Sequence, residues 1–213
     1  MSTWLASKSF IKICGVTNAL DAQEVIKSGA DALGMIFADS PRAISTSRAT
    51  QVSEVTKGHL TRVAVFRDRD DAEILAILEQ VGVDAVQLHD AMSAELEKQL
   101  RARRLGIIKA LAITGEEFAH FDERRVDLVL IDGERAGSGE AHSWARLEER
   151  SFRVPFVAAG GLTPENVANV INALHPWGVD CATGVETRPG EKDATRVSIF
   201  VANARRAFDE KRE

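Results

Sequence analysis

Short apolar runs alternate with amphipathic stretches along the whole chain. By their periodicity, the apolar runs predict eight strands, at residues 10–16, 32–37, 62–66, 85–89, 107–113, 127–132, 155–159 and 179–182. The stretches that follow them predict eight helices, near residues 18–28, 47–57, 70–80, 93–104, 115–123, 144–149, 165–174 and 193–210. Helix-capping residues agree with these positions, because Thr17 or Asn18 can cap the first helix and Ser93 the fourth.

This alternation predicts the fold class. Strands separated by helices favour parallel neighbours joined by right-handed crossovers. Eight units in 213 residues allow about 27 residues each, which suits an α/β fold of the (β/α)8 TIM-barrel type. A doubly wound open sheet is the alternative, but the Gly-rich turn expected after its first strand is replaced here by Cys-Gly-Val-Thr at 14–17. No linker rich in Pro, Gly or Ser divides the chain, so we expect one barrel domain over residues 1–213.

Composition narrows the possible partners. The chain has 27 Lys and Arg against 32 Asp and Glu, a net charge of −5, so no basic field is present to bind nucleic acid. Its longest apolar stretch, residues 32–38, is far shorter than the roughly 18 residues of a membrane span, and the first ten residues lack the pattern of a secretory signal. Two cysteines suit a reducing cytoplasm. The five scattered histidines show no zinc-ligand spacing, so we expect no metal.

Candidate chemistry lies at the carboxyl ends of the strands, where the βα loops of a barrel surround one pocket. Cys14 ends the first predicted strand, Gln87 and His89 end the fourth, and Asp132 ends the sixth. Glycine lets backbone amides approach a ligand closely, and three consecutive loops predict a phosphate site. These loops carry Gly137, Ser138 and Gly139, then Gly160 and Gly161, then Thr183 and Gly184.

Cys14 has two interpretations. A strand cysteine is usually a small buried hydrophobe. However, Lys12 shares its strand face, and a neighbouring cation favours the thiolate, so we expect a pKa below the free-thiol value of about 8.5. Asp180 on the neighbouring last strand is the expected partner of Lys12. Cys181 lies off that face, and we interpret it as a packing residue.

The other polar candidates also have plain structural alternatives. Asp132 is either a helix-capping residue or a general acid whose pKa is raised by partial burial. Arg42 follows a proline in a loop and can simply be solvated. His89 can equally be a strand-end histidine whose hydrogen bonds are satisfied.

Six segments together resemble the phosphoribosylanthranilate isomerase family of tryptophan biosynthesis. They span nearly the whole chain in the family's order and include every predicted functional loop: IKICGVTNALDA (11–22), SGADALGMIF with SPR (28–42), DAVQLH (84–89), Asp132 with GSG (137–139), AAGGLTPENV (158–167) and GVDCATGVETRPGEKD (178–193). The resemblance implies an Amadori rearrangement, without metal or organic cofactor, of N-(5-phosphoribosyl)anthranilate to 1-(o-carboxyphenylamino)-1-deoxyribulose 5-phosphate.

The resemblance also implies roles for individual residues. Asp132 would be the general acid that protonates the furanose ring oxygen, and Cys14 the general base that removes the proton from C2 of the sugar. Arg42 would pair with the anthranilate carboxylate. The amides of the three glycine-bearing loops would hold the phosphate. Gln87, His89 and Asp180 complete the expected substrate-binding set, and the sequence predicts no oligomeric state.

Several positions depart from the family pattern, and they put the binding of the phosphate and the packing of the sixth loop in question: Asp90, Ala136, Glu140, His142 and Ala182.

Three other functions compete with the isomerase. One is a Schiff-base aldolase that uses Lys109 in its apolar strand. Another is a phosphate-binding barrel without activity. The third is the related isomerase of histidine biosynthesis, which carries an aspartate at the position of Cys14.

Overall fold

The computed structural model describes residues 9–133, 147 and 151–210 of the chain. Eight parallel strands close into a barrel, in which β1 pairs with both β2 and β8. The strands are β1 (Phe10–Cys14), β2 (Ala32–Phe37), β3 (Thr61–Phe66), β4 (Ala85–Leu88), β5 (Gly106–Ala112), β6 (Leu128–Asp132), β7 (Phe156–Ala159) and β8 (Gly178–Cys181). The predicted barrel is therefore confirmed. The open-sheet alternative is wrong, because pairing between β1 and β8 leaves no edge strand.

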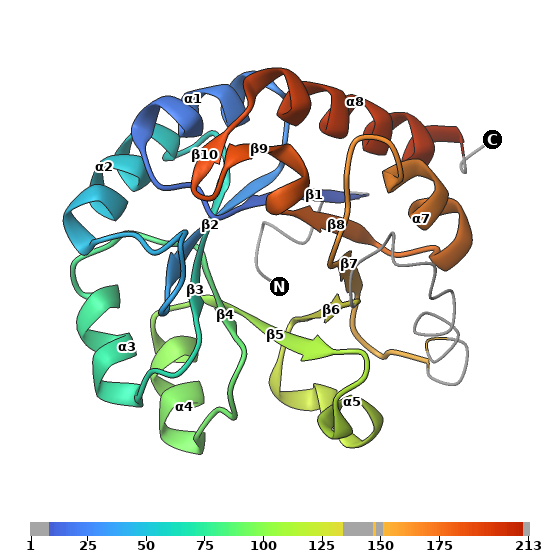
Figure 1. Ribbon diagram of the computed structural model, residues 1–213. Helices are drawn as coiled ribbons and strands as arrows, with labels where there is room; N and C mark the ends of the chain where they lie inside the picture. Colours follow the sequence, from blue (N-terminus) through green and yellow to red (C-terminus); the bar gives the residue numbers. More distant parts are fainter. Residues whose placement is uncertain (1–8, 134–146, 148–150, 211–213) are drawn as a thin grey trace.

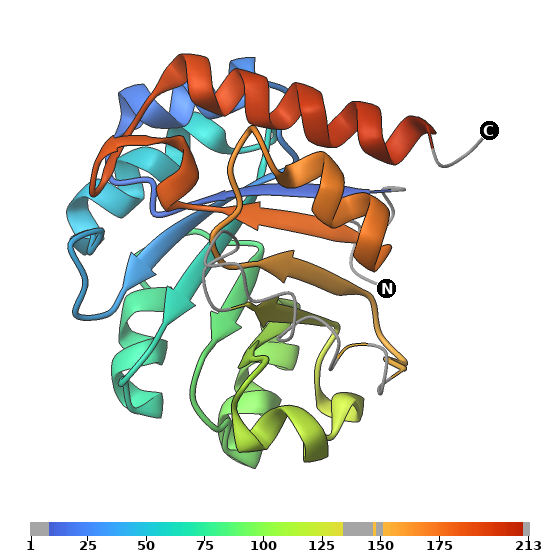
Figure 2. The same ribbon diagram turned by 45° about the vertical axis from the view of Figure 1, so that its right-hand side comes forward.

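Helices surround this barrel on the outside (Figures 1 and 2). They are α1 (Ala19–Lys27), α2 (Thr46–Thr56), α3 (Asp71–Leu78), α4 (Ala94–Ala102), α5 (Glu116–His120), α7 (Val167–Leu174) and α8 (Ala194–Glu210). The side chains of Asn18 and Ser93 cap α1 and α4 as predicted. The fifth predicted helix is shorter than expected and is followed by a 3-10 turn at Glu123–Arg125. The helix predicted at 144–149 lies outside the described residues, apart from position 147.

Two apolar layers result from the alternation of side chains along each strand. On β1, Ile11 and Ile13 face the helices and join the outer layer, whereas Phe10 and Cys14 belong to the layer inside the barrel. Lys12 shares the inward face of β1 and is 1% exposed. This geometry directs a cation and a thiol from one strand toward the barrel interior.

A short antiparallel hairpin between β8 and α8 was not expected from the sequence. After a 3-10 turn at Thr183–Val185, it consists of β9 (Glu186–Arg188) and β10 (Glu191–Lys192). The hydroxyl of Thr17 donates to the carbonyl of Gly190 over 2.6 Å, which ties the hairpin to the loop after β1. Figure 1 shows the hairpin beside the carboxyl ends of β1 and β2.

Across the parts of the chain that the structure describes, no helix combines the length and apolar character needed to traverse a bilayer.

Candidate active site

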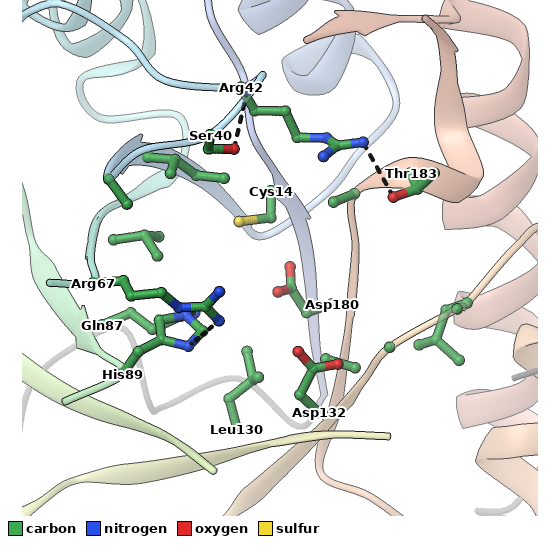
Figure 3. Close-up of a pocket in the computed structure, with 18 of the residues that line it drawn as sticks. Cys14, Ser40, Arg42, Arg67, Gln87, His89, Leu130, Asp132, Asp180 and Thr183 are labelled. Carbon is green, nitrogen blue, oxygen red and sulfur yellow. Dashed lines mark hydrogen bonds between the residues drawn. The ribbon is translucent and has the colours of Figure 1, made fainter. Parts of the chain in front are cut away.

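A cavity of about 640 Å³ opens at the carboxyl ends of the barrel strands (Figure 3). Every predicted site residue within the described part of the chain lines it: Cys14, Arg42, Gln87, His89, Asp132, Gly160, Gly161, Asp180, Thr183 and Gly184. The predicted loop residues Gly137, Ser138 and Gly139 lie outside the described residues, as do the departures at 136, 140 and 142. Barrel closure thus brings residues from opposite ends of the chain around one opening.

Cys14 ends β1 with its sulfur directed into this cavity (Figure 3). The side chain is buried, with 6% of its surface exposed. Gly34 on β2 makes room for it, because a Cβ at that position would lie 2.7 Å from the sulfur. The cysteine is therefore both a buried residue of the inner layer and a thiol that faces the cavity.

The expected depression of the Cys14 pKa is wrong. Burial raises the pKa of the thiol, and the carboxylate of Asp180 raises it further. Lys12 and Lys192 lower the pKa, but their combined effect is smaller than that of burial and Asp180. Lys12 does pair with Asp180 as predicted, over 2.8 Å between Nζ and Oδ2. Because the lysine charge is shared with that carboxylate and the sulfur is desolvated, the thiol holds its proton in the resting protein.

Asp180 has one oxygen in this ion pair and one oxygen left over. Its Oδ1 is buried and accepts no hydrogen bond from a described residue. In Figure 3 the carboxylate lies between Cys14 and Asp132. A buried acceptor without a partner is costly, so a hydroxyl group of a bound molecule would relieve that cost.

Asp132 ends β6 in a partly buried position. Burial raises the pKa of its carboxyl group, and the nearby charge of Asp180 adds to that rise, while Arg67 and Lys12 oppose it. Gly160 allows the loop after β7 to pass close by, because a Cβ there would meet the carbonyl of Gly133 and Oδ1 of Asp132. The carboxyl group keeps its proton to a higher pH than a free one, which suits a general acid.

His89 is neutral, and its tautomer follows from its neighbours. Nη2 of Arg67 lies 2.9 Å from Nδ1 of His89. A guanidinium only donates hydrogen bonds, so Nδ1 accepts and the ring proton resides on Nε2. That proton needs an acceptor. Nε2 of Gln87 lies 3.2 Å from Nε2 of His89 and Oε1 of Gln87 has no partner among the described residues, so exchanging the amide nitrogen and oxygen of Gln87 supplies the acceptor and satisfies both groups. Burial and the Arg67 charge lower the pKa of His89 to about 4.

Arg67 was missed in the sequence analysis, although it lines the cavity directly after β3. The signal was available, because it occupies the same strand-end position that singled out the other candidates. Its contact with His89 makes it part of the site.

Arg42 is not the solvated loop arginine of the plain alternative. Its Nε and Nη2 donate to the carboxylate of Glu186 over 2.8 to 3.0 Å, and Nη2 also reaches Oγ1 of Thr183 over 3.3 Å. The backbone NH of Arg42 donates to Oγ of Ser40. Gly15, directly after β1, lets the arginine stem pack against the backbone, since a Cβ there would lie 2.8 Å from Cδ of Arg42. Glu186 is a second residue that the sequence analysis did not single out.

Lys109 is not in this cavity, and the aldolase hypothesis is wrong for that reason. The residues on either side of it in β5 belong to the inner layer, so Lys109 faces outward, toward α5. Its Nζ donates to the carbonyls of His89 and Asp90 over 2.8 and 3.1 Å and pairs with Glu117. The lysine anchors the segment after β4.

The described residues include no group of His, Cys, Asp and Glu placed to hold a metal ion.

Comparisons with known proteins agree with this geometry. A family model described as N-(5'phosphoribosyl)anthranilate (PRA) isomerase matches residues 11–203. The N-(5'-phosphoribosyl)anthranilate isomerase of Oceanobacillus iheyensis is 36% identical over 202 residues, covering 92% of this chain and 97% of that protein.

Two crystal structures of phosphoribosyl anthranilate isomerase also resemble this chain. The Thermotoga maritima structure has a TM-score of 0.81 at 35% identity, with 92% of this chain and 98% of that chain covered. Another, in complex with reduced 1-(o-carboxyphenylamino)-1-deoxyribulose 5-phosphate, has a TM-score of 0.76, the same identity and the same coverage.

Proposed function

The chain belongs to the N-(5'-phosphoribosyl)anthranilate isomerase family, and we propose that Cys14 and Asp132 divide the proton transfers of that reaction between them. The protein is an aldose–ketose isomerase of tryptophan biosynthesis that converts N-(5-phosphoribosyl)anthranilate into 1-(o-carboxyphenylamino)-1-deoxyribulose 5-phosphate. The observation that carries the residue roles is the placement of this thiol and this carboxyl group around one cavity.

The reaction needs an acid and a base at different atoms. Asp132 gives its proton to the furanose ring oxygen as the C1–O bond breaks, and the nitrogen lone pair forms a protonated imine. The thiolate of Cys14 then takes the proton from C2, and the C–H electrons move to neutralise the imine as an enolamine. This enolamine gains a proton at C1 and loses the C2 hydroxyl proton, which yields the ketone. A carboxyl group with a raised pKa suits the first step.

The remaining polar groups suit the rest of the substrate. Arg42 lines the cavity. Because Glu186 holds its Nε and Nη2, we assign the end of the guanidinium that carries Nη1 to the carboxylate of the anthranilate group. The unpartnered Oδ1 of Asp180 is assigned to a ribose hydroxyl. The phosphate is assigned to the loops of Gly160 and Gly161 and of Thr183 and Gly184, which line the same opening.

Gln87 and His89 belong to the same proposal. They lie at the end of β4, next to Arg67. Because the ring of His89 is neutral, Arg67 is the positively charged group of these three. A small phosphoribosylated substrate is the partner that this set of groups fits.

We also propose that residues 1–213 form one barrel domain. The two free, buried cysteines suit a reducing compartment, and we therefore propose that the protein works in the cytoplasm.

The two catalytic assignments can be tested by substitution. Cys14→Ala and Asp132→Asn should each lower kcat/KM for freshly prepared N-(5-phosphoribosyl)anthranilate by roughly 10² to 10⁴, measured by the loss of substrate fluorescence. Cys181→Ser is the matched control, because Cys181 is buried outside the cavity and donates to the carbonyl of Leu162. Full activity of either variant would reject its assigned role, and binding without turnover by the unmodified protein would favour the inactive phosphate-binding barrel.

A further inference from the structure

The guanidinium of Arg42 is held chiefly along one edge by Glu186, and its Nη2 also donates to Oγ1 of Thr183 over 3.3 Å. Its Nε and Nη2 face the carboxylate of Glu186 in a forked arrangement, with Nε 2.9 and 3.0 Å from the two oxygens and Nη2 2.8 Å from Oε2. Its Nη1 donates to no described residue, and the side chain of Arg42 lines the cavity. The arginine therefore has a fixed inner edge and an end that remains available to a second carboxylate.

Glu186 is itself held from the opposite side. Its side chain is 3% exposed and receives Nζ of Lys192, which is completely buried, over 2.8 Å. The same Nζ donates to the carbonyls of Cys14 over 2.6 Å and of Ala182 over 3.3 Å. Lys192 thus ties the hairpin that carries both residues to the ends of β1 and β8. A buried carboxylate held on two sides has little freedom to turn.

The charges of this cluster still favour an anion. Two cations, Arg42 and Lys192, surround one carboxylate, so the cluster keeps one net positive charge. Burial alone would raise the pKa of Glu186, but hydrogen bonds from Arg42 and Lys192 outweigh it and hold the pKa below its usual value. Glu186 is therefore ionised at neutral pH without cancelling the attraction of Arg42 for a carboxylate.

From these contacts we infer that Glu186 is a positioning residue, which turns the free end of Arg42 toward the substrate carboxylate while Lys192 compensates its charge. The inference rests on the proposed assignment of Arg42 to the anthranilate group. It makes the hairpin a determinant of substrate specificity, because the hairpin selects for an aromatic amine that carries a carboxylate.

The test compares two substrates that differ only in this carboxylate: N-(5-phosphoribosyl)anthranilate and N-(5-phosphoribosyl)aniline. The readout is the ratio of their kcat/KM values, which a general loss of folded enzyme does not change. Glu186→Gln should lower the ratio about tenfold, the effect of about 1.4 kcal/mol in carboxylate binding, chiefly by raising KM for the anthranilate substrate. Glu186→Asp, which keeps the charge but shortens the reach, should lower the ratio less and replaces the Gln variant if that one does not fold.

Two comparisons separate positioning from a general effect. Glu191→Gln is the matched control, because Glu191 lies in the same hairpin, bonds to Arg188 and Thr187 and does not contact Arg42. It should leave the ratio unchanged. In an Arg42→Met background, Glu186→Gln should lower the ratio no further, because a positioning residue acts only through the group that it holds.

The outcomes distinguish this inference from the assignment beneath it. If Arg42→Met lowers the ratio and Glu186→Gln does not, the positioning role is overturned and the assignment of Arg42 stands. If Arg42→Met itself leaves the ratio unchanged, the assignment fails and the inference fails with it. A full additional loss in the double variant would show that Glu186 acts independently of Arg42, which also overturns the inference.

Discussion

At the scale of single residues, the chemistry of Cys14 depends on groups that share its face of the barrel. Lys12 lies two positions away on the same strand, and its charge alone predicts a more acidic thiol. The structure confirms Asp180 on β8 as the partner of Lys12, and it adds burial of the sulfur, which is the largest cause of the raised pKa. Burial and the Asp180 carboxylate together reverse the predicted direction of the pKa shift. The sequence indicated both neighbouring charges, whereas the burial that outweighs the effect of Lys12 was decided by the fold.

The charge of Asp180 leads to a prediction about the thiol. Because this carboxylate raises the pKa of Cys14, Asp180→Asn should lower that pKa and shift iodoacetamide labelling of Cys14 to lower pH. The experiment is done in a Cys181→Ser background, so that Cys14 is the one cysteine that remains. The labelling rate is followed by mass spectrometry between about pH 7 and 10.5. An unchanged or higher midpoint in the Asn variant would contradict the electrostatic account.

At the scale of elements, periodicity predicted every barrel strand to within about two residues, because each strand has to bury a continuous apolar run. The hairpin of β9 and β10 escaped this reasoning, since its strands are only three and two residues long and too short to show a period. The orientation of Lys109, on which the competing aldolase hypothesis depended, was not decided by the sequence either. Alternation places Lys109 on the same face of β5 as Ile107 and Leu111, but in a strand that is apolar on both faces it does not show which face is turned to the helices.

Lys109 provides a prediction about the segment after β4. Its ammonium group saturates the carbonyls of His89 and Asp90, so Lys109→Met keeps the apolar stem but leaves these acceptors without their donor. The free energy of unfolding should fall by about 1–3 kcal/mol, the usual cost of an unsatisfied buried polar group, as measured by urea denaturation. Lys98→Met on the exposed face of α4 is the control. Equal stability of the two variants would show that the anchor contributes nothing.

At the scale of the whole molecule, closure of the barrel decides which residues form the site. Lys192 and Cys14 are 178 residues apart in the chain and joined by a hydrogen bond. The two groups proposed as catalytic, Cys14 and Asp132, both have raised pKa values, yet the proposed mechanism requires Asp132 protonated and Cys14 ionised. The active form is therefore a minority at neutral pH, and its population sets the pH dependence of the reaction.

This combination predicts a characteristic pH profile of kcat/KM. Below the pKa of Asp132 activity rises with pH, because the thiolate population grows while the carboxyl group stays protonated. Between the two pKa values the gain of thiolate and the loss of protonated carboxyl offset each other, so the profile is flat, and it falls above the pKa of Cys14. In Asp132→Asn the residual activity should instead rise with pH up to the thiol pKa. Parallel profiles of the two proteins would contradict this division of roles.

The sequence by itself determined the barrel, its order of strands and helices, and the family. Hydrophobic patterns and short motifs are properties of residues close together in the sequence, so they can be recognised without knowledge of the fold. Only the tertiary structure decided the resting charge state of Cys14, the tautomer of His89 and the bracing of Arg42 by Glu186 and Lys192. Each of these depends on burial and on side chains brought within hydrogen-bond distance by strand pairing and barrel closure, which no local pattern encodes.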